Sequence, residues 1–137
     1  MRRLVPWLVG FGCAALAACA GTPDCATPYA SATLLEMHGG RSRENAPEVS
    51  DADLTRFFQE EAVPRFPEGF TIKDARGQWR DAKTGQSISE RSVVFSVIVP
   101  GDASEARSKL DAMGLAYVRR FSQQAVMRTA APVCVAF

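Results

Sequence analysis

The segment 92–99 (SVVFSVIV) constrains the fold of this chain more than any other stretch. A strand built from it carries apolar side chains on both sides, interrupted by Ser96 alone. A sheet with one face in water normally alternates apolar with polar residues. We therefore expect a strand with both faces covered, and Pro100 and Gly101 predict its end.

A strand and a helix precede this segment. Residues 33–37 have the composition of a strand, which Gly39 and Gly40 are expected to end. Ser50 predicts a helix N-cap, with two aspartates in the first turn where the helix dipole favours anions. Leu54, Phe57, Phe58 and Ala62 then follow at helical spacing, so we assign that face to the core rather than to a ligand pocket.

Three elements complete the pattern. Residues 70–80 predict a strand in which Gly77 indicates a bulge or a close backbone approach, and residues 81–87 predict a turn that makes a hairpin with 92–99. Asp102 predicts the N-cap of a second helix, and Glu105 is expected to complete a capping box. Residues 123–129 predict a last strand before the apolar tail 133–137.

The resulting order is strand, helix, strand, strand, helix, strand. This order predicts an α+β fold of the ferredoxin-like split βαβ type (βαββαβ), an antiparallel sheet with two helices on one face. The alternative is a less regular α+β domain in which one predicted strand is absent. We assign residues 31–137 to this single domain.

The first eighteen residues have the properties of an export signal. Two arginines precede an uncharged stretch, Leu4 to Ala18, that is short for a membrane span. Leu16-Ala17-Ala18-Cys19 resembles the lipobox of bacterial lipoproteins, which implies cleavage before Cys19 and lipidation of its thiol. The alternative is an ordinary signal peptide, cut for example after Ala20. With Ala20 rather than Asp after the cysteine, the resemblance implies the outer membrane, facing the periplasm.

The remaining cysteines are Cys25 and Cys134, because Cys13 belongs to the signal and Cys19 to the lipid. An exported protein meets an oxidising compartment, so we expect these two to form a disulfide. Closing a loop of this length would stabilise the fold by about 4–5 kcal/mol in the chain-entropy model. The alternative is two free thiols. We expect residues 19–30 to form a flexible tether.

Composition excludes several classes of partner and site. The chain carries 16 Lys and Arg residues against 15 Asp and Glu, with no clustered basic face, so we expect no nucleic-acid partner. There is no phosphate-binding glycine loop, and His38, the single histidine, has no CxxC pair beside it. We therefore predict neither cofactor nor metal.

Residues 64–71 (PRFPEGFT), followed by Asp74 and by Gly77-Gln78-Trp79, carry a family resemblance. They resemble an uncharacterised family of short bacterial secreted proteins and lipoproteins, a domain of unknown function. Family members share an RFP-DG-LT turn, a GQW segment and a C-terminal cysteine near a final Phe. The first strand departs from the family pattern, since residues 33–37 (TLLEM) replace a TLYFG-like sequence. The resemblance supports the fold and the compartment and leaves the activity open.

The candidate ligand-binding residues are Arg76, Gln78, Trp79 and Arg80. Trp79 between two guanidinium groups could offer a flat polar-aromatic surface for a carboxylate or a ring. The alternative is that Trp79 packs at the edge of the domain while both arginines are solvated. We assign no catalytic residue: Glu36, Asp74 and Glu90 would form a carboxylate pair only if neighbouring strands aligned them.

Three hypotheses for function follow. The first is a lipid-anchored binding or interaction module of the cell envelope; the others are an enzyme that uses the open sheet face as a pocket and a structural envelope component. Two helices on one face would leave Val94 and Ile98 uncovered on the other. We expect a homodimer through that open face, with the tail 133–137 as the alternative cover.

Overall fold

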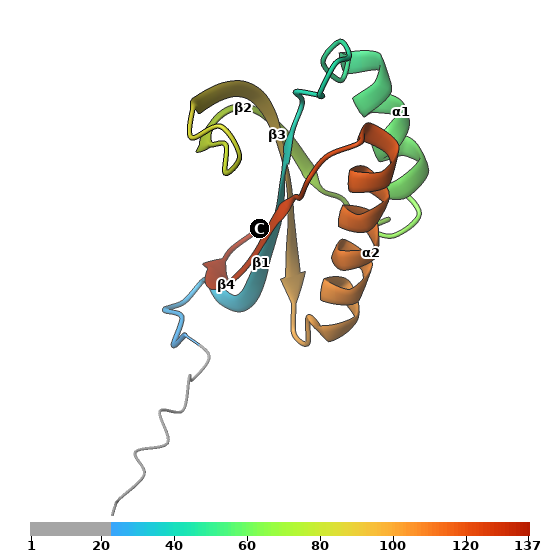
Figure 1. The fold of residues 1–137 in the computed structure, drawn as a ribbon. Helices are drawn as coiled ribbons and strands as arrows, with labels where there is room; N and C mark the ends of the chain where they lie inside the picture. Colours follow the sequence, from blue (N-terminus) through green and yellow to red (C-terminus); the bar gives the residue numbers. More distant parts are fainter. Residues whose placement is uncertain (1–22) are drawn as a thin grey trace, which may run out of the picture.

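The computed structural model describes residues 23–137, so the predicted signal segment and Cys19 lie outside the described residues. The elements are β1 (Ala30–Gly40), α1 (Asp51–Glu61), β2 (Thr71–Arg80), β3 (Ser87–Pro100), α2 (Ser104–Phe121) and β4 (Met127–Val135). The strands form one sheet of order β2-β3-β1-β4 in which all neighbours are antiparallel. Both helices cover the same face (Figure 1). The predicted ferredoxin-like α+β fold is confirmed.

The core lies between the helices and the sheet. Phe95, at the centre of β3, contacts the rings of Phe58, Phe66 and Phe70, with ring centroids 5.0–6.1 Å apart. Phe57 of α1 packs edge-on against Tyr117 of α2 at 5.2 Å. Burying each such side chain contributes about 1.5–3 kcal/mol, so this aromatic cluster is what holds the helices on the sheet.

Helix α1 begins as the sequence predicts. Ser50 is its N-cap: the Ser50 hydroxyl accepts from the Asp53 amide at 3.1 Å, and the Asp53 carboxylate accepts from the Ser50 amide. Leu54, Phe57 and Phe58 are buried, as their spacing predicts.

The start of α2 differs from the prediction. Its N-cap is Ala103, and the carboxylate of Asp102 instead accepts hydrogen bonds from the amide and hydroxyl of Ser104. Asp102 lies one residue before the N-cap position, so it forms no capping box with Glu105. The Glu105 carboxylate instead forms an ion pair with Lys109 at 2.7 Å.

Strand β1 is longer than predicted, because β3 and β4 pair with it on both sides beyond residues 33–37. Gly39 and Gly40 lie inside the strand rather than ending it. A Cβ on Gly39 would lie 2.7 Å from the ring of Tyr117, and one on Gly40 would lie 2.6 Å from the Glu90 carboxylate. Both glycines therefore permit close packing.

Strand β4 lies later in the chain than predicted. It runs from Met127 to Val135 and pairs with β1 from His38 to Ala30. Residues 133–135 therefore extend the edge of the sheet, and the tail does not cover the open face. The prediction that the tail covers the open face is wrong, because residues 133–135 pair with β1 as part of strand β4.

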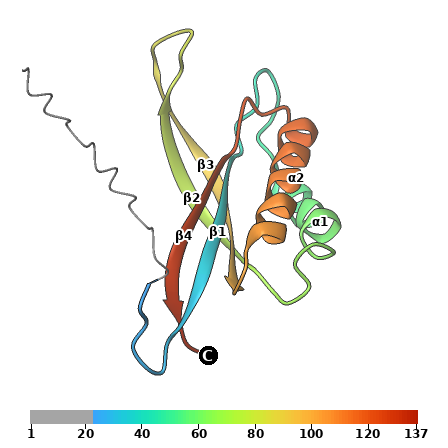
Figure 2. The same cartoon turned by 90° about the horizontal axis from the view of Figure 1, so that it is seen from below.

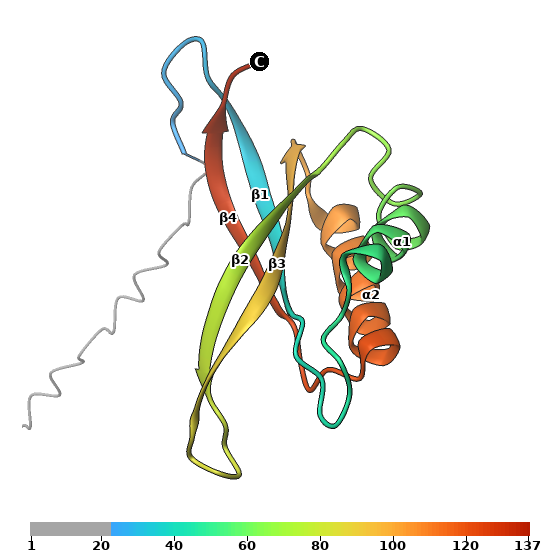
Figure 3. The same cartoon turned by 90° about the horizontal axis from the view of Figure 1, so that it is seen from above.

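The β2–β3 hairpin extends past the helices at one end of the sheet (Figures 2 and 3). Its register is continuous from Thr71 opposite Ser96 to Arg80 opposite Ser87, without a bulge. The sequence predicts either a bulge or a close backbone approach at Gly77, and the structure shows the close approach: a Cβ there would lie 2.8 Å from the Ser92 hydroxyl oxygen. In the turn, the Asp81 carboxylate accepts from the amides of Lys83 and Thr84.

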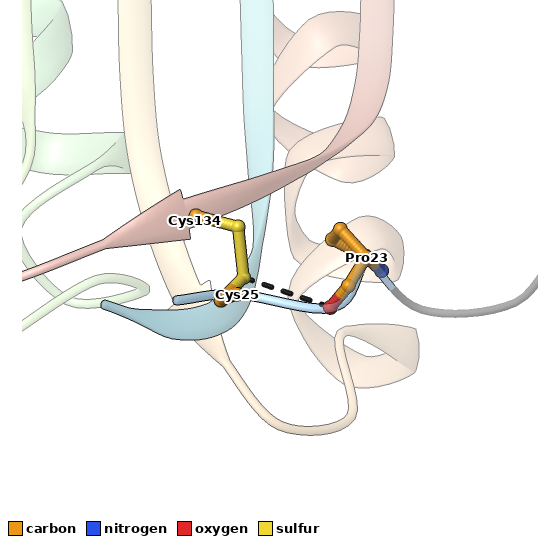
Figure 4. Close-up of a disulfide and its surroundings, with 3 residues drawn as sticks. All are labelled: Pro23, Cys25 and Cys134. Carbon is orange, nitrogen blue, oxygen red and sulfur yellow. Dashed lines mark hydrogen bonds between the residues drawn. A yellow bond between two sulfur atoms is a disulfide. The ribbon is translucent and has the colours of Figure 1, made fainter. Parts of the chain in front are cut away.

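Cys25 and Cys134 form the predicted disulfide, with an S–S distance of 2.00 Å (Figure 4). It joins the segment before β1 to the end of β4. Neither helix of the described residues is long and apolar enough to cross a membrane.

Candidate functional site

The face of the sheet opposite the helices carries a polar centre, which we define as Glu36, His38, Lys73 and Ser96. Strand register places Glu36 beside Ser96, and the Ser96 hydroxyl donates to the Glu36 carboxylate at 2.7 Å. His38 Nε2 lies 3.5 Å from the second carboxylate oxygen, and Lys73 Nζ lies 3.7 Å from the first. Three strands therefore converge on one partly buried carboxylate.

The polar centre keeps Glu36 ionised. The hydrogen bond from Ser96 holds the pKa of Glu36 below its ordinary value; partial burial acts in the opposite direction, and the charges of His38 and Lys73 lower the pKa further. Glu36 is therefore a fixed acceptor for a hydrogen-bond donor or a cation at neutral pH.

Apolar side chains surround the polar centre on this open face. Leu34 lies opposite Ile98, His38 lies opposite Val94 on one side and Met127 on the other, and Trp79 lies opposite Ile88. Ile98, Trp79 and Met127 are large apolar residues that are exposed. Strand β3 is thus apolar on both faces, as its sequence predicts, and the described residues leave its second face open.

A cleft of about 930 Å³ begins at the polar centre and extends around the end of β3. Glu36, Lys73 and Ser96 line its polar end, and Leu34, Ile98 and Val99 are among its apolar walls. The ladder with β2 ends at the pair of Thr71 and Ser96, so residues 97–100 have no strand partner on that side within the described chain. The cleft therefore lies along a short free strand edge.

The loop before β2 forms the other wall of the cleft. Residues Arg65–Thr71, which carry most of the motif singled out in the sequence, all line it. Phe66 and Phe70 fix the loop by packing on Phe95, and Gly69 has a φ of 117°, which favours glycine. The shape of this loop thus accounts for residues 65–71 of the motif, whereas Gly77-Gln78-Trp79 lies farther along β2.

The predicted ligand-binding residues lie elsewhere, and on two faces. Arg76, Gln78 and Arg80 alternate with Trp79 along β2, so Trp79 lies on the open face and the other three on the opposite one. Gln78 donates to the Ser87 hydroxyl at 2.9 Å, and Arg80 donates to the Gly85 carbonyl at 2.9 Å. The cross-strand partner of Trp79 lies eight residues from Ser96 along β3, roughly 25 Å from the cleft.

The acidic residues considered as a carboxylate pair are separated. Asp74 lies on the helix side of β2, 3.7 Å from Arg41. Glu90 lies on the open face and accepts from the Ser42 amide at 3.0 Å. Its carboxylate lies against Gly40, which is four residues and roughly 13 Å from Glu36 along β1. These acids therefore serve separate local contacts and form no dyad.

Sequence reasoning missed a second ionic cluster, around the buried Arg41. Its guanidinium lies 2.7 Å from Asp51, and its Nε donates to the Val49 carbonyl at 2.8 Å. Arg91 joins the same cluster through Glu48 at 2.9 Å. These contacts hold the loop between β1 and α1 onto the sheet, which is a structural role. Nothing in the local sequence of Arg41 distinguishes it from the solvated arginines near it.

Ser96 and Lys73 were also missed as site residues. The only signal for Ser96 was its place as the one polar residue in an apolar strand. Among the described residues, no cluster of three or more His, Cys, Asp or Glu side chains could hold a metal ion.

Residues 35–137 match the family described as "Protein of unknown function (DUF3574)". The chain belongs to this family. This match confirms the family resemblance that residues 64–79 indicate. No match was found among curated proteins.

Solved structures similar to this DUF3574 chain include a phage SAM lyase in complex with S-methyl-5'-thioadenosine. The two sequences are 15% identical and the TM-score is 0.62; the match covers 77% of this chain and 90% of the lyase chain. A phage SAM lyase in its apo state gives 17% identity and a TM-score of 0.54, covering 78% and 90%. A putative PII-like signalling protein from Thermus thermophilus gives 16% identity and a TM-score of 0.38, covering 78% and 91%. At these identities the likeness to the lyase shows the fold alone.

Proposed function

We propose that this chain is a lipid-anchored protein of the bacterial cell envelope whose folded domain is a small binding module. The anchor is Cys19, and the destination is the outer membrane, facing the periplasm. The disulfide between Cys25 and Cys134 supports export, because such bonds persist in oxidising compartments and are rare in the cytosol.

The observation that carries the binding function is the cleft that begins at Glu36. Binding sites are concave and mostly apolar, with a few placed polar groups. The cleft combines apolar walls at Leu34, Ile98 and Val99 with the ionised Glu36 and the exposed Lys73 at one end. Further charged side chains also line it, namely Arg65, Glu68, Asp102, Glu105 and Lys109. A partner with an apolar segment next to a hydrogen-bond donor or a cationic group fits this arrangement.

The same geometry favours binding over nucleophilic catalysis. An activated serine needs a base that accepts its proton. The Ser96 hydroxyl donates to Glu36, a carboxylate whose lowered pKa makes it a weak base, and His38 contacts that carboxylate rather than Ser96. Ser96 thus orients Glu36 as an acceptor.

We propose a second copy of the chain as the partner of the open face. Leu34, Val94 and Ile98 form an apolar surface on both sides of the polar centre, and no segment among residues 23–137 covers it. Two such faces brought together would remove these side chains from water without any other protein.

The anchor is tested by Cys19→Ser, which should abolish labelling with fatty acid and release the domain from the membrane fraction. Unchanged labelling and fractionation would contradict the lipoprotein assignment. The single exchange leaves both disulfide cysteines in place, so the folded domain provides its own control.

The binding face is tested with a photo-crosslinking amino acid at Ile98 in the anchored protein in cells. We expect a discrete product of twice the chain mass, which Leu34→Arg abolishes. The matched control places the same amino acid at Leu115, 55% exposed on α2. Equal labelling at both positions, or no product at Ile98, would contradict binding through the open face.

A further inference from the structure

The disulfide shortens the tether between the lipid and the domain. Cys25 is bonded to Cys134 of β4 and lies six residues after Cys19. An extended chain spans at most about 3.3–3.6 Å per residue, so the six residues from Cys19 to Cys25 span at most about 20 Å. Without the bond, the chain would be free as far as Ala30, the start of β1, and the reach would be nearly twice as long. With the lipid anchor proposed above, on which this inference rests, the short tether holds one end of the domain close to the bilayer.

The two strands that meet at this end, β1 and β4, carry no charged side chain over their terminal stretches. The charged side chains nearby belong to neighbouring segments: Asp24 precedes Cys25, and Asp102 and Glu105 line the same cleft as Phe137. Residues 25–35 and 129–137 contain no Asp, Glu, Lys, Arg or His. The two stretches lie side by side, because Ala30 pairs with Val135 and Leu35 pairs with Ala130. Figure 2 shows the start of β1 and the end of β4 together at the end of the sheet opposite the hairpin turn. This uncharged pair of stretches is called the anchor end.

The anchor end exposes two aromatic side chains just beyond the paired strands. Tyr29 is 53% exposed and Phe137 is fully exposed. Aromatic rings of this kind favour the boundary between lipid and water, where a tyrosine keeps its hydroxyl wet and its ring in an apolar environment. Charged side chains, which are costly to bury in the acyl region below that boundary, are absent from both stretches.

We infer that the anchor end rests on the surface of the lipid bilayer, with Tyr29 and Phe137 at the depth of the headgroups. The sheet then stands upright, and the charged hairpin turn with Arg80, Asp81 and Lys83 points away from the membrane (Figure 3). Because Phe137 also lines the cleft, the cleft lies beside the membrane, whereas Trp79 is displayed far from it.

Tryptophan fluorescence in lipid vesicles tests this orientation. After cleavage before Cys19, Trp79 is the single tryptophan of the chain, since Trp7 leaves with the signal. The lipidated Trp79→Phe/Phe137→Trp protein is placed in phosphatidylcholine vesicles that contain lipids with a nitroxide quencher on the headgroup, which quench a tryptophan at headgroup depth. We expect strong quenching of this variant and little quenching of Trp79 in the wild-type protein.

The matched control is Trp79→Phe/Leu115→Trp, which places the tryptophan on the outer surface of α2 and should remain unquenched. Equal quenching at positions 137, 115 and 79 in vesicle-bound protein would overturn the orientation and leave the anchor intact. Protein that stays outside the vesicle fraction would contradict the anchor itself and this inference with it.

The role of the disulfide has its own measurement. Cys25→Ser/Cys134→Ser in the Trp79→Phe/Phe137→Trp protein lengthens the tether, so quenching should fall while the lipid label is retained. Circular dichroism verifies that this variant is folded. Undiminished quenching in folded protein would contradict the role of the short tether.

Discussion

The hydroxyl of Tyr117 on α2 donates to the carbonyl oxygen of Gly40 on β1 at 2.9 Å, and its ring lies directly against Gly39. This contact joins the second helix to the end of β1, a central strand of the sheet. Burial raises the pKa of Tyr117, so its hydroxyl keeps its proton and remains a donor at all ordinary pH values. The pair of glycines is therefore part of the packing between the helices and the sheet.

Gly39→Ala is predicted to destabilise the domain by about 1–3 kcal/mol, because the new methyl group would overlap the buried ring of Tyr117. Urea unfolding of the domain gives the free energy. Leu115→Ala, on the solvent side of the same helix, is the control and should change the midpoint little. Equal midpoints for both variants would show that the ring moves aside at no cost.

Loss of the disulfide is predicted to lower the free energy of unfolding by up to about 4–5 kcal/mol, because the bond joins residues separated by 109 positions in the chain. The comparison is between oxidised wild-type protein and Cys25→Ser/Cys134→Ser in urea. A digest without reductant should contain the linked peptides. Complete alkylation of both thiols in protein taken from the envelope without reductant would refute the bond.

Ser96→Ala is predicted to raise the pKa of Glu36 toward its ordinary value of 4.5, because the largest cause of the lowered pKa is lost. A depressed folded pKa stabilises the fold fully above the unfolded pKa and loses that effect as the pH falls through the folded pKa. The stability difference between wild type and Ser96→Ala should therefore shrink as the solution is acidified below about pH 4.5. NMR titration of Glu36 gives the pKa directly.

The control for the Ser96→Ala experiment is Glu36→Gln, because a glutamine side chain does not titrate. In this background Ser96→Ala should change the stability equally at all pH values. If the pH dependence persisted there, it would have to come from another group.

The fold was predictable because its signals are local. Ser50 with its aspartates, the phenylalanines of α1 and the doubly apolar strand β3 each specify their element through nearest neighbours in the chain. The place of β4 was missed because Pro132 and the short side chains around it lack a strand signal, and β1 supplies the pairing that makes them a strand. That partner is distant in the chain, since Thr33 lies opposite Pro132.

The candidate site was predictable only in part, because it depends on register. Glu36, Ser96 and Lys73 come from three strands, and only their alignment brings them together. The segment 76–80 attracted attention by composition alone, yet strand alternation divides it between two faces. Composition identifies residues capable of binding, whereas pairing between strands decides which of them meet.

The open face gives the last prediction. Ile98 is exposed there, beside Leu34 and along the same side of β3 as Val94, so a second copy would bury all three. We expect light scattering of the lipid-free domain (residues 19–137 with Cys19→Ser) to give a dimer, and Ile98→Asp to give a folded monomer. An aspartate at an exposed position leaves the core intact, whereas in the dimer it would place an unpaired charge in an apolar interface. Leu115→Asp, on the helix side of the molecule, should leave the dimer unchanged. A wild-type domain that stays monomeric at high concentration would exclude the second copy as the partner of the open face.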